Sequence, residues 1–162
     1  MKPEEEIGKI LKEKNYTIST AESCTGGLLS SKLTDVSGSS DYIKLNFVTY
    51  SNEAKHNILG VKNETLKKYG AVSEQCAQEM AEGLQKYTNA DIVICTTGIA
   101  GPTGGTKDKP VGLMYTSVKY NGIVTVKKVI LKDISDRISI KNQFANEALK
   151  LALTILKEDR IA

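Results

Sequence analysis

The sequence predicts a layered α/β domain with a mixed β-sheet. Segments with helical spacing of apolar residues alternate along the chain with short apolar or β-branched runs, as in domains where helices cover a sheet. Two of the later runs flank Asn121-Gly122, and an Asn-Gly pair in that position is the strongest short signal for a β-hairpin. Because a hairpin pairs its strands antiparallel, the sheet cannot be wholly parallel.

The first half of the chain is predicted from spacing and caps. Apolar residues at helical spacing, preceded by acidic ones, predict a helix over Glu4–Lys14, and β-branched alternation predicts a strand over Tyr16–Thr20. A polar loop then leads into a helical run that contains Leu28, Leu29 and Leu33, and a turn follows at residues 37–40. The next expected elements are a strand over Ile43–Tyr50, a helix capped by Ser51 or Asn52 and ended by Gly60, and a helix over Asn63–Tyr69.

The second half adds a longer helix, three strands and a final helix. Ser73 caps the longer helix, which places Cys76, Met80 and Leu84 on one face. The apolar run Asp91–Thr97 predicts a buried strand, and the hairpin strands are Gly112–Tyr120 and Ile123–Leu131. The final helix is expected over Ser135–Lys157, and its inner face should contain Ile138, Phe144, Ala148, Leu151 and Leu156.

Composition narrows the class of protein. The 162 residues suit a single domain over 1–162, and 40% apolar residues can form a core. The net charge is only +3 and the basic residues are scattered, so no nucleic-acid partner is expected. No segment reaches the roughly 20 apolar residues of a membrane span, so no membrane partner is expected either. An N-terminus without an apolar signal region, and three cysteines without disulfide spacing, predict a cytoplasmic location.

The loop Glu22-Ser23-Cys24-Thr25-Gly26-Gly27 is the first of three candidate site segments, each of which follows a predicted strand. Ligands of open α/β sheets bind at such strand ends. The loop carries hydroxyl and thiol groups, and its Gly-Gly pair opens a helix whose free N–H groups suit an anion or a developing oxyanion. The alternative is an ordinary capped helix start with nothing bound.

The second candidate segment contains Tyr50 at a strand end and Lys55 in the first turn of the next helix. The positive helix end disfavours another cation, which should lower the pKa of Lys55 and suit it as a general base. The alternative is a solvated surface lysine. A catalytic triad would have to use the single histidine, His56, which points about 100° away from Lys55 on a helix.

The third candidate segment is the glycine-rich loop from Gly98 to Gly105, which includes Gly101 and Gly104. Its many accessible backbone groups could surround a ligand, although it matches neither common nucleotide-binding glycine motif. The alternative is a long, mobile connection. No metal is expected, because one histidine excludes sites with two or three histidines and no zinc-finger or EF-hand spacing is present.

Four ordered motifs together resemble the CinA C-terminal-domain family. They are residues 21–27 (AESCTGG), 49–55 (TYSNEAK), 70–73 (GAVS) and 98–105 (GIAGPTGG), followed by 109–112 (KPVG). The resemblance covers nearly the whole chain. It implies a three-layer α/β/α domain that associates with itself as a homo-oligomer. The implied activity is that of a nicotinamide-nucleotide amidase, which converts nicotinamide mononucleotide and water to nicotinate mononucleotide and ammonia without a cofactor.

The resemblance also implies roles for individual residues. Ser23 stands at the family's nucleophile, Lys55 at its base and Tyr50 at a helper of that base. The substrate-binding positions are Thr25, Gly26, Gly27, Gly98, Gly101, Gly104, Gly105 and Arg137. One departure concerns the late motif, where the family has Gly-Asp-Arg and a second arginine four residues on. This chain has Ser135-Asp136-Arg137 and then Lys141, which acts as a point charge and cannot bind phosphate bidentately.

Two alternatives to this enzyme remain at this stage. Cys24 is adjacent to Ser23 and could be the nucleophile, as a thiol is in many amidases. The chain could instead be a nucleotide-binding or regulatory protein without turnover, linked to competence or DNA damage as the family's name suggests. Arg137 is expected to hold the substrate's phosphate, against the alternative of a surface ion pair with Asp136 or Asp133.

Overall fold

A computed structural model describes residues 1–161, with side chains described up to residue 159. Its centre is one five-stranded sheet in the order β2-β1-β3-β4-β5. The strands are β1 (Ile18–Glu22), β2 (Ile43–Val48), β3 (Ile92–Gly98), β4 (Leu113–Tyr120) and β5 (Ile123–Ile130). Strand β1 pairs parallel with β2 and β3, whereas β3–β4 and β4–β5 are antiparallel, so the prediction of a mixed sheet is confirmed.

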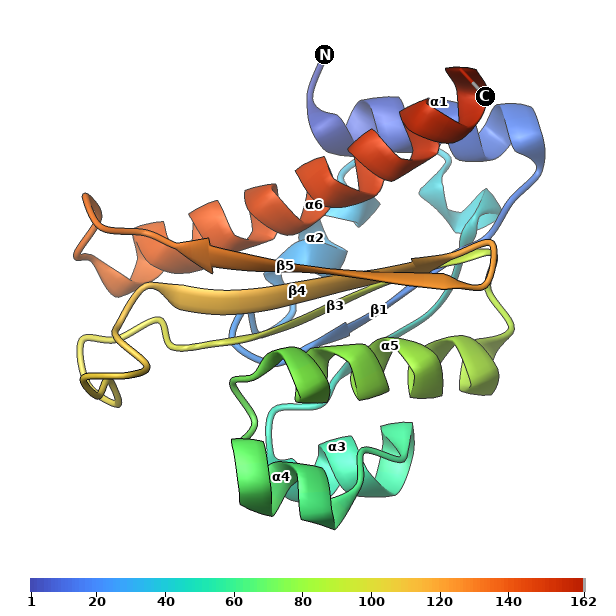
Figure 1. The fold of residues 1–162 in the computed structure, drawn as a ribbon. Coiled ribbons are helices and arrows are strands. Elements are labelled where there is room, and N and C mark those ends of the chain that lie inside the picture. Colours follow the sequence, from blue (N-terminus) through green and yellow to red (C-terminus); the bar gives the residue numbers. More distant parts are fainter. Residues whose placement is uncertain (162) are drawn as a thin grey trace.

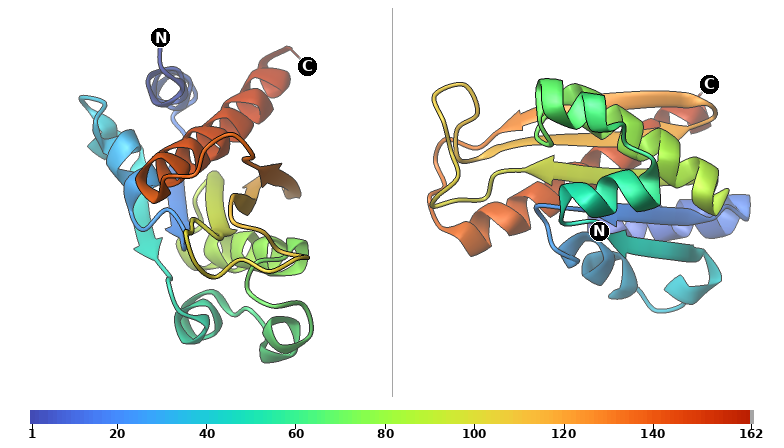
Figure 2. Two further views of the ribbon diagram at one scale, coloured as in Figure 1. Left: turned by 90° about the vertical axis from the view of Figure 1, so that its left-hand side faces the viewer. Right: turned by 90° about the horizontal axis from the view of Figure 1, so that it is seen from below.

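Helices cover both faces of this sheet, which confirms the three-layer α/β/α architecture (Figures 1 and 2). One face carries α5 (Glu74–Thr88), with α3 (Asn52–Leu59) and α4 (Asn63–Tyr69) packed against it. The other face carries α1 (Pro3–Lys14), α2 (Leu28–Thr34) and α6 (Arg137–Ile161), and the 3₁₀ turn η1 (Ser39–Asp41) leads into β2.

The core has one main cluster on each covered face of the sheet and a third, smaller cluster where the first turns of α6 pack against β4 and β5. The larger cluster packs α1, α2 and α6 on one face, and its side chains include Ile7, Leu33, Ile94 and Leu149. The other cluster packs α5 on the opposite face and includes Met80, Leu84 and Val93. Strands β1 and β3 are buried over nearly their whole lengths, as expected for central strands covered on both sides.

Most predicted element ends are close to the observed ones, because local caps form as expected. The Ser51 and Ser73 side chains accept hydrogen bonds from backbone N–H groups of α3 and α5, and Gly60 ends α3 in a left-handed conformation. Asn121 and Gly122 have φ values of 51° and 77°, the left-handed backbone that a two-residue hairpin turn requires.

Several sequence-based expectations differ from the structure. The strand expected over Ile43–Tyr50 ends at Val48, and the helix expected over Ser135–Lys157 spans Arg137–Ile161. The first strand begins two residues later than predicted and extends to Glu22, because Glu22 pairs with Val48 of β2 and Thr96 of β3. Ile138 was expected on the inner face of the last helix, but its side chain is 70% exposed. It lies in the first turn of α6, which projects beyond the sheet (Figure 1).

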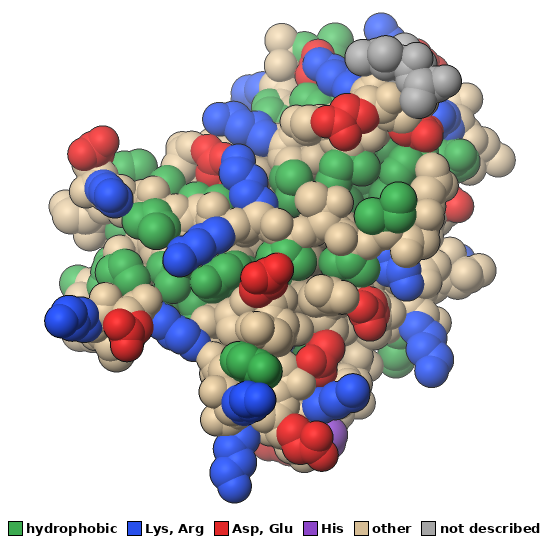
Figure 3. Space-filling model, viewed as in Figure 1, with side chains coloured by type: hydrophobic (Ala, Val, Ile, Leu, Met, Phe, Trp, Pro, Cys, Tyr) green, Lys and Arg blue, Asp and Glu red, His purple; other side chains and the backbone are tan. Residues whose placement is uncertain are grey.

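The surface shows no grouping of one charge on the face drawn in Figure 3, where Lys and Arg alternate with Asp and Glu. Among residues 1–161, no helix is long and apolar enough to cross a membrane. Lys14 of α1 forms an ion pair with Asp159 of α6 at 3.0 Å, which joins the two outer helices at the end of the sheet away from the candidate loops.

Candidate active site

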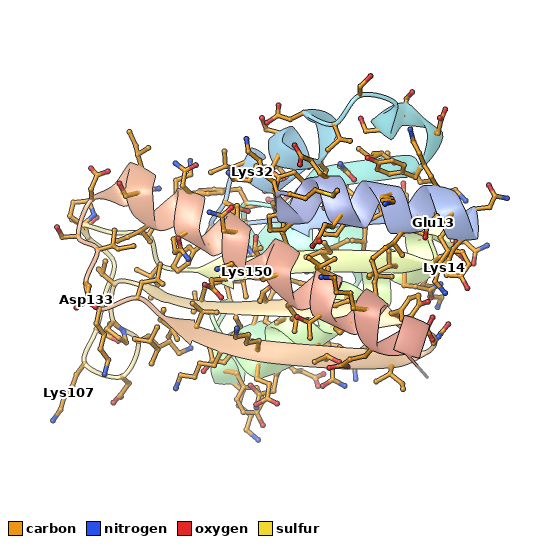
Figure 4. The ribbon with its side chains drawn as sticks, turned by 90° about the horizontal axis from the view of Figure 1, so that it is seen from above. Glu13, Lys14, Lys32, Lys107, Asp133 and Lys150 are labelled. Atoms are coloured by element: carbon orange, nitrogen blue, oxygen red, sulfur yellow. The ribbon has the colours of Figure 1, made fainter. Side chains whose placement is uncertain are left out.

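The three candidate loops meet at one edge of the sheet. Strands β1, β2 and β3 are parallel, so their carboxyl ends, and the loops that follow them, lie at the same edge. Strand β5 ends there as well, which brings the start of α6 beside the glycine-rich loop. In Figure 4, the labels of Lys107, two residues after the glycine-rich loop, and of Asp133 in the β5–α6 connection mark this end of the molecule.

Ser23 and Lys55 form the chemical centre of this edge. The Lys55 Nζ atom lies 3.1 Å from the Ser23 Oγ atom and 3.2 Å from the backbone carbonyl oxygen of Tyr50. The Ser51 cap sets the start of α3, so that Lys55 is the fourth residue of the helix and points back beneath the end of β1. Two residues that are 32 positions apart in sequence thus form a serine–lysine pair within hydrogen-bonding distance.

Lys55 is an unusual lysine because only 1% of it is exposed. Its Nζ atom has no carboxylate within ion-pairing distance among the described residues. Burial disfavours the charged ammonium and lowers the pKa of Lys55, as predicted. The main cause of the lowered pKa is burial, whereas the sequence had suggested the positive N-terminal end of the helix that carries Lys55. The lowered pKa favours a neutral amine, which can accept a proton from the Ser23 hydroxyl.

Cys24 lies beside Ser23 but faces a different environment. Its side chain packs in an apolar cluster with Ala100, Met114 and Phe144. Burial raises the pKa of the Cys24 thiol to about 12, so the reactive thiolate is scarce at neutral pH. Cys24 therefore serves as a small core residue under the site, and the geometry favours Ser23 as the nucleophile.

Arg137 connects three segments of the site. It is the first residue of α6, and one guanidinium nitrogen donates to the Gly101 carbonyl oxygen at 2.6 Å. The other donates to the Tyr50 hydroxyl at 3.4 Å. The expected alternative, an ion pair with Asp136 or Asp133, is not present in the described part of the chain.

Comparison with known proteins identifies the family. The model of the CinA C-terminal domain matches residues 1–156. The chain belongs to the CinA C-terminal-domain family. A protein of Thermoanaerobacter pseudethanolicus named as competence-damage inducible is 52% identical over 148 residues, which are 91% of this chain and 35% of that protein. A CinA-like protein of Chloroherpeton thalassium is 50% identical over 94% of this chain and 37% of its own length. The chain thus spans about a third of these relatives.

Solved CinA structures share the fold over nearly the whole chain. The competence/damage inducible protein CihA of Agrobacterium tumefaciens is 42% identical with a TM-score of 0.88, covering 96% of this chain and 95% of that one. A CinA superfamily protein of Klebsiella pneumoniae is 31% identical with a TM-score of 0.90, covering 96% of each chain. The mixed sheet with helices on both faces is therefore the fold of CinA superfamily proteins.

The predicted binding residues of this CinA domain divide into two groups. Thr25, Gly26 and Gly27 line a hollow of about 280 Å³ between the start of α2 and the first turns of α6, where Lys141 also lies. A side chain at Gly26 would come within 3.4 Å of the Lys141 Nζ atom. The residue that departs from the family motif is thus in the site.

The glycines of the third loop have a packing role. A Cβ atom at Gly98 would lie 2.6 Å from the Leu113 carbonyl oxygen, and one at Gly101 would lie 2.4 Å from a Val111 methyl carbon. Gly105 would similarly approach the Val111 backbone nitrogen, at 2.8 Å. Gly104 has φ +90° and more space around it. The loop folds tightly onto residues 111–114, which places the Gly101 carbonyl against Arg137.

Sequence reasoning gave no role to Glu22 or Thr96, which lie beside the serine loop. Both are fully buried, and the Ser23 backbone N–H donates to Thr96. An acidic residue at a strand end, directly before the candidate nucleophile, is the signal that could have drawn attention to Glu22. Its hydrogen bonds occupy the start of α2, where the sequence had suggested free N–H groups for an anion.

His56 takes no part in the site. Its Nδ1 atom lies 2.7 Å from the Val61 carbonyl oxygen, and its Nε2 atom lies 3.3 Å from the Asn63 side-chain nitrogen. Both ring nitrogens are therefore engaged at the far end of α3. Within residues 1–161, no three His, Cys, Asp or Glu side chains are grouped as metal ligands would be.

Proposed function

We propose that this chain is an amidohydrolase that converts nicotinamide mononucleotide and water to nicotinate mononucleotide and ammonia. The observation that carries the proposal is the buried Ser23–Lys55 pair at 3.1 Å, in which Lys55 has a lowered pKa and, among the described residues, no carboxylate partner. A serine is a weak nucleophile unless an adjacent base removes its proton. The choice of substrate rests on the CinA C-terminal-domain resemblance of the four motifs.

In the first half of the reaction, the Ser23 Oγ atom attacks the carboxamide carbon while its proton passes to neutral Lys55. The Lys55 ammonium then donates that proton to the amide nitrogen, the C–N bond breaks and ammonia leaves. The product is an ester between Ser23 and the nicotinoyl carbon. The 3.1 Å separation suits both transfers, since proton exchange requires hydrogen-bond distance.

In the second half, water attacks the ester carbonyl and Lys55 removes a proton from the water. The bond between the carbonyl carbon and the Ser23 oxygen breaks, and Lys55 returns the proton to Ser23. One amide and one water thus give one acid and one ammonia, and both residues regain their starting states. The same lysine acts as base and acid in turn, so no further titratable side chain is needed.

Backbone groups supply the electrostatic part of the mechanism. Within the described chain, the N–H groups of Gly27 and Gly101 have no protein acceptor and are candidates for holding the oxyanion. Tyr50 helps through its backbone carbonyl, which receives a hydrogen bond from Lys55 and orients the amine. Its hydroxyl is directed to Arg137 instead, so we assign the helper role to the Tyr50 main chain.

The phosphate of the substrate is proposed to bind near Arg137 and Lys141. Both belong to the first turns of α6, and the N-terminus of a helix of this length favours an anion. The guanidinium keeps further N–H donors beyond the two that hold Gly101 and Tyr50. Lys141 adds a second positive charge beside Gly26.

Ammonia release from nicotinamide mononucleotide tests the proposal. Ser23→Ala should abolish the release, whereas Cys24→Ala should retain most of it because the buried thiol is not the nucleophile. An active Ser23→Ala enzyme with an inactive Cys24→Ala enzyme would reverse the nucleophile assignment. A wild-type chain that binds the mononucleotide without releasing ammonia would instead support a nucleotide-binding or regulatory protein without turnover.

A further inference from the structure

Glu22 and Ser23 are neighbours at the end of β1, yet their side chains serve different parts of the molecule. Ser23 faces Lys55 of α3, whereas the Glu22 carboxylate lies at the start of α2, on the other face of the sheet. Glu22 is completely buried and forms no ion pair among the described residues. Burial of a carboxylate without a cationic partner costs free energy unless several hydrogen-bond donors surround it, so the donors around Glu22 are important for the fold.

The Glu22 carboxylate accepts four hydrogen bonds. One oxygen accepts from the Thr25 hydroxyl at 2.6 Å and the Leu29 N–H at 2.7 Å. The other accepts from the Ser30 N–H at 2.9 Å and the Ser30 hydroxyl at 2.7 Å. The residue that would normally cap α2 is Gly27, which has no side chain. Glu22 therefore performs the capping from the preceding strand.

A chain of hydroxyls extends this contact to the backbone of the nucleophile. Because a carboxylate only accepts, the Thr25 hydroxyl donates its proton to Glu22. Thr25 must then accept from the Thr96 hydroxyl, 2.9 Å away. The Thr96 hydroxyl oxygen in turn accepts from the Ser23 backbone N–H at 3.3 Å, and the Thr96 backbone carbonyl oxygen shares this donor at 3.1 Å. The Glu22 carboxylate thus sets the direction in which the Thr25 and Thr96 hydroxyl groups donate their hydrogen bonds.

The loop that these contacts hold is otherwise weakly restrained. Residues 24–27 contain two consecutive glycines with positive φ. Within this described loop, the backbone N–H groups of Gly26 and Leu28 donate only to carbonyl oxygens three residues earlier, which forms local turns. An amide in place of the carboxylate would present an NH₂ group to donors, because only one oxygen could still accept. The loop would then lose either its attachment to Thr25 or the cap of α2.

We infer that Glu22 is a positioning residue of the proposed amidase: its carboxylate, through the Thr25–Thr96 hydroxyl chain and the cap of α2, holds Ser23 in line with Lys55. This inference rests on the proposed function for its kinetic consequence, but not for its structural one. Glu22 touches no reacting atom, so it should affect turnover and leave substrate affinity almost unchanged.

The experiment compares Glu22→Gln with a matched control, Glu79→Gln. Glu79 of α5 likewise accepts a backbone N–H, from Lys62 at 2.9 Å, and a hydroxyl, from Thr65 at 2.6 Å, but it lies away from the site. Glu22→Gln should lower kcat by about 10- to 100-fold, since small misplacements of a nucleophile have effects of that size, with KM within about twofold. Glu79→Gln should keep the wild-type kcat even though it loses hydrogen bonds of the same kinds.

Amide hydrogen exchange across residues 23–30, measured on the same proteins, requires no substrate. Exchange there should accelerate in Glu22→Gln and stay unchanged in Glu79→Gln. If the wild type releases no ammonia, the proposed function fails while exchange still decides the role of Glu22. Wild-type kcat or unchanged exchange in Glu22→Gln would overturn the inference. If Glu22→Gln does not fold, Thr25→Val removes the hydroxyl that joins Glu22 to Thr96 and leaves the three hydrogen bonds from Leu29 and Ser30, and a wild-type kcat in that variant would overturn the inference equally.

Discussion

Lys55→Met should stabilise the fold while it abolishes turnover. The wild-type ammonium would have three N–H donors, but the described residues offer acceptors for two, Ser23 and the Tyr50 carbonyl, and no carboxylate. The side chain is almost fully buried, so water cannot replace the missing partners easily. Methionine is similar in length and apolar, and it fills the same space without a charge to desolvate.

The magnitude follows from the unpaired donor and the bond that is lost. An unsatisfied buried polar group lowers the free energy of unfolding by about 1–3 kcal/mol, and Lys55→Met removes this penalty. The variant also loses the hydrogen bond to Ser23, which reduces the gain by about 1 kcal/mol. The expected net stabilisation is about 0–2 kcal/mol near pH 6. For a domain of this size, that corresponds to a rise in Tm of up to roughly 8 °C.

The gain should depend on pH with a definite sign. Between the lowered pKa of folded Lys55 and its unfolded value of about 10.4, the unfolded chain binds a proton that the folded chain does not. The free energy of unfolding of the wild type therefore rises with pH across this window. The stability advantage of Lys55→Met is complete below the folded pKa of Lys55 and decreases between the folded and the unfolded pKa.

Urea unfolding at about pH 6 and about pH 10 measures this difference, because the two values lie far below and close to the unfolded pKa. Lys67→Met, which changes an exposed lysine of α4, is the control and should leave stability unchanged at both pH values. Two results would refute the argument that burial of the Lys55 amine destabilises the fold. One is a Lys55→Met protein that is less stable than wild type near pH 6, and the other is a stability advantage that grows with pH.

Three further predictions concern catalysis. The rate of ammonia release should rise with pH to a plateau reached below about pH 10.4, because the base is neutral Lys55 with a lowered pKa. Lys55→Arg should be nearly inactive, and near-normal turnover of this variant would exclude Lys55 from the mechanism. Arg137→Ala should raise KM for the mononucleotide and barely alter the weaker reaction of the phosphate-free riboside; equal losses on both would mean that Arg137 mainly holds the loops together. Tyr50→Phe should keep kcat within about threefold, since the helper group is the main-chain carbonyl and a lost contact of the hydroxyl with Arg137 costs little; an inactive variant would assign the role to the hydroxyl.

Local chemistry determined most of the elements of this protein. Serine caps, the ends at Gly60 and Gly70 and the Asn121-Gly122 turn act over a few residues, so the sequence alone predicts where helices and strands lie. The layered fold and the grouping of three loops at one sheet edge follow from the alternation of elements and from the four motifs. The exposed position of Ile138 could not be predicted, because it depends on how far α6 extends past the sheet.

Only the tertiary structure decided what each candidate side chain faces. Ser23 and Cys24 are adjacent in sequence, yet one contacts Lys55 and the other is buried in an apolar cluster, a difference set by the direction of the chain after β1. Lys55 became a buried amine because α3 packs against α5 and the Lys55 side chain reaches the Ser23 hydroxyl after β1, which composition does not reveal. Glu22 had no role until the start of α2 was placed against it. Burial and long-range contacts control both protonation and geometry, and neither is encoded in short sequence patterns.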